Sequence, residues 1–300
     1  MKLPSNLATA LTGRRIGSWL FLSVLALTTP ASAPAQPADS GASLTGQASS
    51  TASATNAALQ SALAFLGKHI YSYEPIYFVL GQYPAAEFQF SLKYKPFDLE
   101  SRWNPVAHTY FAYTQTSFWD LITQDPSFYD TSYKPSAFLW YPGLLQKSRF
   151  QLDLQGGVEH ESNGRGGSEE RSLNTIYLQP TFSYDLPAHF QISLQPRVWD
   201  YISLGSNNPD LPAYRGYGDL LGAVTWNEPS SGEKIQFASR LRIGDEGRYA
   251  GTWFILRFNL PYRSHFNPSV QLQYFTGYGQ TLRQYNQTSS AFRAGLCIWY

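Results

Sequence analysis

Three side chains that could together carry out nucleophilic chemistry lie close in sequence: His160, Ser162 and Asn174. A serine hydroxyl becomes an effective nucleophile when a neighbouring base takes its proton, and histidine, which titrates near neutrality, is the natural base. Asparagine can accept a hydrogen bond from the second imidazole nitrogen, as it does in Cys–His–Asn proteases. The three residue types therefore predict a Ser–His–Asn triad.

The hydrophobic pattern around the triad predicts two neighbouring strands. In segment 148–160, apolar and polar residues alternate, and His160 and Ser162 continue the apolar parity. Asn174 begins the apolar parity of the next segment, 173–184. Residues two apart in an extended chain are about 6.5–7 Å apart, and adjacent strands bring side chains on one face within reach of each other. We therefore expect the three side chains on one face of a hairpin.

The same alternation continues through most of the chain and predicts a barrel. The expected strands cover about 74–83, 87–95, 107–118, 135–142, 148–160, 173–184, 189–203, 215–227, 233–244, 250–260, 267–276 and 289–300. Charged residues make up only 14% of the chain and aromatic residues 16%, a balance suited to a membrane wall with aromatic girdles. The fold class is therefore all-β: a transmembrane antiparallel β-barrel of about 12 strands. A soluble β-sandwich is the alternative.

The N-terminal region differs in composition from the predicted barrel. Residues 1–35 have the basic, apolar and small-residue regions of a signal peptide, with cleavage expected after Ala35. Residues 36–68 are predicted to be a flexible periplasmic leader, because 36–58 are almost without large apolar groups. Residues 57–67 could form a short amphipathic helix ahead of the first strand. The barrel domain is expected over 69–300.

Composition and parity also limit other functions. The net charge of +1 argues against a nucleic-acid partner, and no Cys/His cluster has zinc-ligand spacing. Twelve strands leave little free pore, which weakens a channel hypothesis. Four charged residues are expected to form ion pairs inside the barrel: Arg149, Asp153, Arg197 and Asp200.

The sequence block around the triad resembles the signature of the outer-membrane phospholipase A family. The block is His160-Glu161-Ser162-Asn163-Gly164-Arg165 followed by Arg171-Ser172-x-Asn174, with similar family blocks at 113–119 and 277–286. The resemblance extends from about residue 70 to the end. It implies a phospholipase A1/A2 in a Gram-negative outer membrane, in which Ser162 attacks an acyl ester of a membrane phospholipid. His160 would be the general base, and Asn174 would orient it.

The resemblance also implies calcium and a homodimer. Arg165 matches the family position whose backbone carbonyl binds Ca²⁺, and Glu170 falls where the family has a serine ligand. A carboxylate suits a hard cation as well. A third ligand, from the partner subunit, maps near Asp125, which could equally be a solvated turn residue beside Pro126.

Two functional alternatives remain open. A non-enzymatic outer-membrane barrel, either a narrow channel or a structural protein, would leave His160, Ser162 and Asn174 as polar residues at the membrane interface. A different lipid hydrolase, such as a lipid A deacylase, could also carry His and Ser on a barrel exterior.

Overall fold

The computed structural model describes residues 45–123, 127–259 and 268–299, with side chains from Ala57 onward. The chain divides into two compact units, and in sequence the smaller ends at Tyr71. The smaller contains helix α1 (Thr45–His69), which is longer than the expected 57–67. The predicted signal peptide, 1–35, and residues 36–44 of the predicted leader lie outside the described residues, and the rest of the leader forms this helix. No helix in the described part of the chain is long and apolar enough to cross a membrane.

The larger unit is built from antiparallel strands joined by short turns and loops. After a three-residue strand β1 (Ile70–Ser72), the strands are β2 (Ile76–Gly81), β3 (Ala86–Tyr94), β4 (Thr109–Asp120), β5 (Ser127–Lys147), β6 (Phe150–Ser162), β7 (Ser172–Asp185), β8 (Phe190–Leu204), β9 (Gly218–Glu228), β10 (Glu233–Ile243), β11 (Ala250–Asn259), β12 (Ser269–Gly277) and β13 (Ser289–Ile298). The loops also carry two 3₁₀ turns, η1 (Pro105–His108) and η2 (Gly167–Glu169), and a five-residue helix α2 (Leu211–Arg215).

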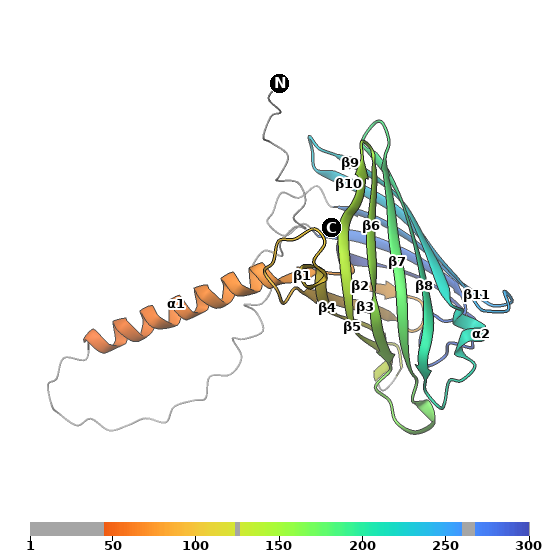
Figure 1. Cartoon of the computed structure of the whole chain (residues 1–300). Coiled ribbons are helices and arrows are strands. Elements are labelled where there is room, and N and C mark those ends of the chain that lie inside the picture. Colours follow the sequence, from red (N-terminus) through yellow and green to blue (C-terminus); the bar gives the residue numbers. More distant parts are fainter. Residues whose placement is uncertain (1–44, 124–126, 260–267, 300) are drawn as a thin grey trace, which may run out of the picture. The chain divides into compact units, whose positions relative to one another are not determined.

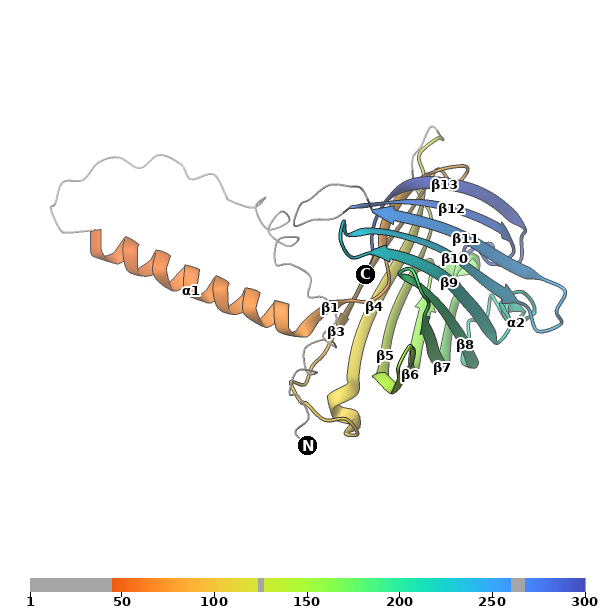
Figure 2. The same ribbon diagram turned by 90° about the horizontal axis from the view of Figure 1, so that it is seen from above.

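The strands β2 to β13 close into a barrel. Each pairs with its neighbour in sequence, and β13 returns to pair with β2, so that Leu296 lies opposite Phe78. Strands β5–β8 lie side by side along one wall and β9–β13 along another (Figures 1 and 2). Closure leaves no free sheet edge, which is the condition for crossing a bilayer with strands. The predicted twelve-stranded barrel is confirmed in the described residues.

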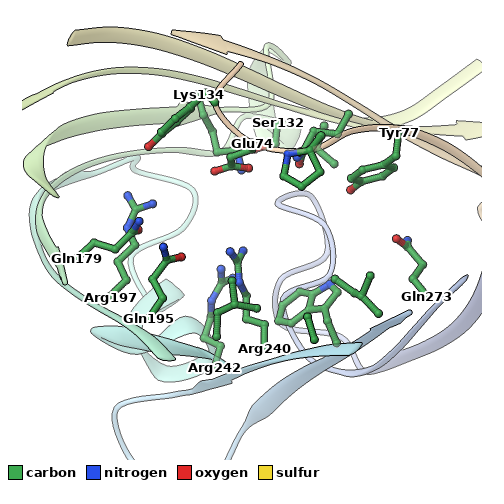
Figure 3. Close-up of a pocket in the computed structure, with 18 of the residues that line it drawn as sticks. Glu74, Tyr77, Ser132, Lys134, Gln179, Gln195, Arg197, Arg240, Arg242 and Gln273 are labelled. Atoms are coloured by element: carbon green, nitrogen blue, oxygen red, sulfur yellow. The ribbon is translucent and has the colours of Figure 1, made fainter. Parts of the chain in front are cut away.

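The two faces of the wall have opposite chemistry. Exposed apolar side chains cover the outside, among them Val158, Leu178 and Val198. The inside is polar and surrounds a cavity of about 600 Å³ lined by glutamine, carboxylate and guanidinium groups. Figure 3 shows Arg197, Arg240 and Arg242 pointing into this cavity.

The predicted interior ion pairs are only partly correct. Arg197 does lie inside, where its guanidinium is 2.9 Å from the Glu159 carboxylate. Asp153 also lines the cavity, where its carboxylate accepts hydrogen bonds from Gly143 N and Gln151 Nε2 and, within the described ranges, forms no ion pair. The other two predictions are wrong. Arg149 lies exposed in the β5–β6 turn, and Asp200 pairs across the strands with the outward-facing Ile176.

Candidate active site on the β6–β7 hairpin

The β6–β7 hairpin brings the predicted base and its orienting group together. In the strand register His160 lies directly opposite Asn174, and His160 Nδ1 is 2.9 Å from Asn174 Oδ1. An amide oxygen can only accept, so Nδ1 must carry the proton of this hydrogen bond. In the neutral imidazole, Nε2 then keeps its lone pair, which is the arrangement that a general base requires.

Ser162 lies on the same face of β6 as His160, at the point where the strand ends. Its cross-strand neighbours are Tyr133 on β5 and Ser172 on β7. Among the described residues the Ser162 hydroxyl has no hydrogen-bond partner, His160 included. Catalytic hydrogen bonds are often long before substrate binds, so this geometry is compatible with a nucleophile and base that engage on binding.

The face that carries these side chains is the apolar one. Val158 and Ile176, the next outward pair along the hairpin, are 45% and 54% exposed. The residues that alternate with the outward ones, such as Gln155 and Glu161, point the other way and line the cavity. The strand register agrees with the sequence parity, since His160 and Asn174 pair two positions from Val158 and Ile176.

Ser203 on β8 is a further member of this group that the alternation pattern did not identify. Its hydroxyl oxygen accepts a hydrogen bond of 2.8 Å from Asn174 Nδ2. A β-bulge brings it there, because Asn174 pairs with Ser203 whereas Thr175 pairs with Tyr201, leaving Ile202 without a partner. Unbroken alternation would have put Ser203 on the inner face with Tyr201.

A buried asparagine shapes the loop that follows Ser162. Asn163 is only 4% exposed, its Nδ2 donates to the Glu169 carbonyl, and its Oδ1 accepts from the backbone amides of Arg165 and Arg171. Directly after Asn163, Gly164 turns the chain with φ +65°, and a Cβ there would lie 2.7 Å from the Tyr133 ring. One amide side chain therefore closes the loop 163–171 on itself.

Ion pairs attach this loop to its neighbours. The Glu169 carboxylate binds the Arg165 guanidinium at 2.9 Å and also contacts the Arg283 guanidinium from the 278–288 loop. The hydrogen bond from Arg283 holds the pKa of the Glu169 carboxyl below its ordinary value. Arg165 also donates to the carbonyls of Phe128 and Tyr129 on β5. The loop is thus fixed to two other segments at the same end of the barrel.

Two of the predicted calcium ligands, Arg165 and Glu170, lie in this loop. The Arg165 side chain is used in the contacts above, and among the residues described its backbone carbonyl accepts no hydrogen bond. The Glu170 carboxylate is exposed and forms no ion pair within the described ranges. Both are oxygen donors of the kind that calcium prefers, so the residues fit the ion chemically. Asp125 lies outside the described residues, and the remainder contain no cluster of three His, Cys, Asp or Glu groups suited to a metal.

Comparisons with known proteins agree with the fold and the residue pattern. The family model described as Phospholipase A1 matches residues 70–298. A putative phospholipase A1 of Neisseria meningitidis serogroup B is 29% identical over 226 residues, covering 72% of this chain and 55% of the relative. Phospholipase A1 of Escherichia coli K12 is 26% identical over 190 residues, covering 62% of this chain and 61% of the relative. The chain thus spans less than two thirds of the length of these curated relatives.

Solved structures show the same barrel. Outer membrane phospholipase A from Escherichia coli superposes with a TM-score of 0.61 at 21% identity, covering 77% of this chain and 98% of that one. The calcium-bound dimer of the Salmonella typhi enzyme gives 0.60 at 21% identity, covering 77% and 92%. Since the family model matches most of the chain, the protein belongs to the phospholipase A1 family, and its fold is the β-barrel of these structures.

Proposed function

We propose that this protein is a calcium-dependent phospholipase that hydrolyses acyl ester bonds of membrane phospholipids. The observation that carries the proposal is the hydrogen bond of 2.9 Å from His160 Nδ1 to Asn174 Oδ1, with Ser162 next along the same face. Membership of the phospholipase A1 family supports the reaction class.

The chemistry follows the order of a serine esterase. His160 Nε2 takes the proton of the Ser162 hydroxyl as Oγ bonds to the ester carbonyl carbon. The tetrahedral intermediate collapses, the bond to the lysophospholipid oxygen breaks, and His160 returns the proton to that leaving oxygen. A water molecule, deprotonated by His160, then attacks the acyl-serine and releases the fatty acid. Asn174 holds the ring in one orientation through both steps.

The outward direction of the triad gives the substrate a route that avoids water. A phospholipid in the surrounding leaflet can keep its acyl chains against apolar wall residues such as Val158 and Ile176 while its ester meets Ser162. A triad facing the cavity would instead require a two-chain lipid to enter a polar space of about 600 Å³. The lipid-facing position is therefore the one suited to this substrate class.

Calcium is the proposed cofactor. The Arg165 carbonyl and the Glu170 carboxylate would hold it beside the triad, in the loop that Asn163 closes. Bound there, the ion would supply a Lewis acid for the negative charge that develops on the ester oxygen.

The active form that we propose is a homodimer, as the Salmonella typhi relative is described. In that arrangement Asp125 of a second copy would complete the calcium site. An incomplete site would keep the monomer silent, which protects the membrane that the enzyme inhabits.

The test is acyl release from detergent-solubilised phospholipid by the refolded barrel, with calcium or with a chelator. The wild-type protein should release fatty acid only with calcium, and Ser162→Ala should abolish release while heat-modifiable migration shows an intact barrel. Hydrolysis that survives Ser162→Ala would refute the nucleophile. Hydrolysis that ignores the chelator would refute the calcium assignment alone. No release by a folded, dimeric wild-type barrel would favour the non-enzymatic alternative.

A further inference from the structure

The Asn174 amide can face His160 in two ways that have nearly the same shape but opposite effects. With Oδ1 toward the ring, the amide accepts the Nδ1 proton, and Nε2 is left as the base. With Nδ2 toward the ring, two donors would meet, and the ring would have to change its tautomer or rotate away. The direction of the His160 ring therefore depends on how firmly the Asn174 amide is held, and a second contact can hold it.

Ser203 supplies that contact. Its hydroxyl oxygen lies 2.8 Å from Asn174 Nδ2, on the side of the amide away from His160. A serine hydroxyl can donate as well as accept, so this contact anchors the amide and does not by itself choose between its two orientations. Two hydrogen bonds in series thus join β8 to β7 and β7 to β6, with the directions His160 to Asn174 and Asn174 to Ser203.

The surroundings offer little to replace this acceptor. Ile176 and Ile202, which flank the pair on the same face, are 54% and 61% exposed and apolar. The nearest outward carboxylate on β8, that of Asp200, accepts a hydrogen bond from the backbone amide of Tyr201. On a wall that faces lipid, water is scarce, so an unpaired amide donor is costly.

The inward packing of two β8 residues explains why Ser203 points outward. Tyr201 and Leu204, three positions apart on β8, both pack inward against the buried cluster of Leu173, Leu211, Leu282 and Tyr285. An unbroken strand cannot turn residues three apart to one face, and the bulge at Ile202 resolves this. The same bulge turns Ser203 toward Asn174.

We propose that Ser203 is a positioning residue, which fixes the Asn174 amide and through it the His160 ring. The proposal rests on the proposed function, because it assigns Ser203 a role in the same hydrolysis. In this role Ser203 acts through Asn174 and makes no contact with the substrate. Its loss should therefore lower kcat and leave KM unchanged.

The first experiment compares Ser203→Ala with Ser193→Ala, the same change on the inner face of the same strand. We expect kcat for acyl release to fall about threefold to tenfold in Ser203→Ala, the rate equivalent of one neutral hydrogen bond. Ser193→Ala should match the wild type. Equal kcat in Ser203→Ala and the wild type would overturn the proposal.

A second pair of variants separates the hydroxyl from the shape of the side chain. Ser203→Thr and Ser203→Val have nearly the same shape, and both suit a lipid-facing strand, so both should fold. Thr should retain kcat because it keeps the acceptor, whereas Val should lose as much as Ala. Equal activity of Thr and Val would contradict the proposal even if Ser203→Ala were unstable.

A double-mutant cycle distinguishes this role from a general structural one. If Ser203 acts only through Asn174, then Ser203→Ala should have no further effect on kcat in an Asn174→Ala background. Multiplying effects would refute the relay and leave the triad intact. If Asn174→Ala is itself silent, then the triad assignment fails, and the positioning role fails with it.

Discussion

Strand β6 carries two kinds of polar contact, one on each face, and the contrast bears on why the proposed triad is neutral. On the inner face, Glu159 pairs with Arg197 at 2.9 Å and Glu161 pairs with Arg215 at 3.0 Å. On the outer face, one residue further in each case, His160 and Ser162 belong to a group whose hydrogen bonds join uncharged partners.

The difference follows from the surroundings of each face. Inside, carboxylates and guanidinium groups are close enough to compensate one another around a polar cavity. Outside, a charged side chain facing hydrocarbon costs up to about 2–4 kcal/mol at mid-depth and less near the interface. An aspartate in the place of Asn174 would add such a charge. If Asn174 faces lipid as proposed, an aspartate in its place should destabilise the barrel by less than a lysine or arginine would. The outer face does carry one carboxylate nearby, that of Asp200 on β8.

The largest expected effect is a loss of activity without a loss of barrel stability. His160→Ala should lower kcat/KM for acyl release by about 10²–10⁴-fold, the usual contribution of a general base. The free energy of unfolding, measured by urea titration in detergent, should stay close to the wild-type value, since His160 is only partly buried. Full activity in this variant would show that His160 is not the general base.

Glu87→Gln, on the inner face, should lower the stability of the barrel and leave its activity unchanged. Glu87 Oε2 lies 3.2 Å from the guanidinium of Arg293, whose side chain is 0% exposed inside the barrel. Removing the carboxylate leaves a buried charge without its counterpart and should lower the free energy of unfolding by about 3 kcal/mol. The rate of acyl release should not change at a temperature at which the variant is folded. A large loss of rate at full folding would contradict the separation of the two faces.

A third variant tests why the orienting residue is neutral. Asn174→Asp keeps an acceptor for His160 Nδ1, so its kcat should exceed that of Asn174→Ala, which we expect to be about tenfold to 100-fold below wild type. The added charge should lower the free energy of unfolding in lipid vesicles by about 1–2 kcal/mol. Stability equal to the wild type in vesicles would mean that Asn174 is not exposed to lipid.

The smallest expected effect concerns the loop beside the triad. Because the pKa of Glu169 is lowered by its hydrogen bond from Arg283, the stabilisation is present above the ordinary pKa of the carboxyl and is lost as the pH falls through the lowered value. Protection of the 163–171 amides from hydrogen exchange, corrected for intrinsic rates, should therefore fall in acid. In Glu169→Gln this acid transition should be absent. A transition of the same size in the variant would assign it to another group.

Strict alternation made the barrel wall and the hairpin predictable from sequence. It predicted one common face for His160, Ser162 and Asn174, because a regular strand has a period of two, and the register does pair His160 with Asn174. It failed at Ser203, because the bulge depends on the inward packing of Tyr201 and Leu204 against distant segments. The start of β5 was also missed, since residues 127–134 place polar groups such as Asp130 and Ser132 inside the barrel.

The calcium ligands were harder to predict than the triad for a physical reason. Arg165 and Glu170 lie in a loop without a repeating pattern, and its shape depends on Asn163 and on Arg283, which is remote in sequence. The carbonyl of Arg165 is common to every residue type, so its identity carries no ligand signal. These two assignments remain predictions carried by the family resemblance.

Covalent labelling is the most direct test of the claim that the chemistry lies on the lipid-facing side of β6. The refolded barrel would be treated with a long-chain alkylsulfonyl fluoride in the presence of calcium, and the modified residue located by tandem mass spectrometry. We predict a single adduct on Ser162 that is greatly reduced in His160→Ala. An adduct on another serine, or equal labelling without His160, would contradict the account.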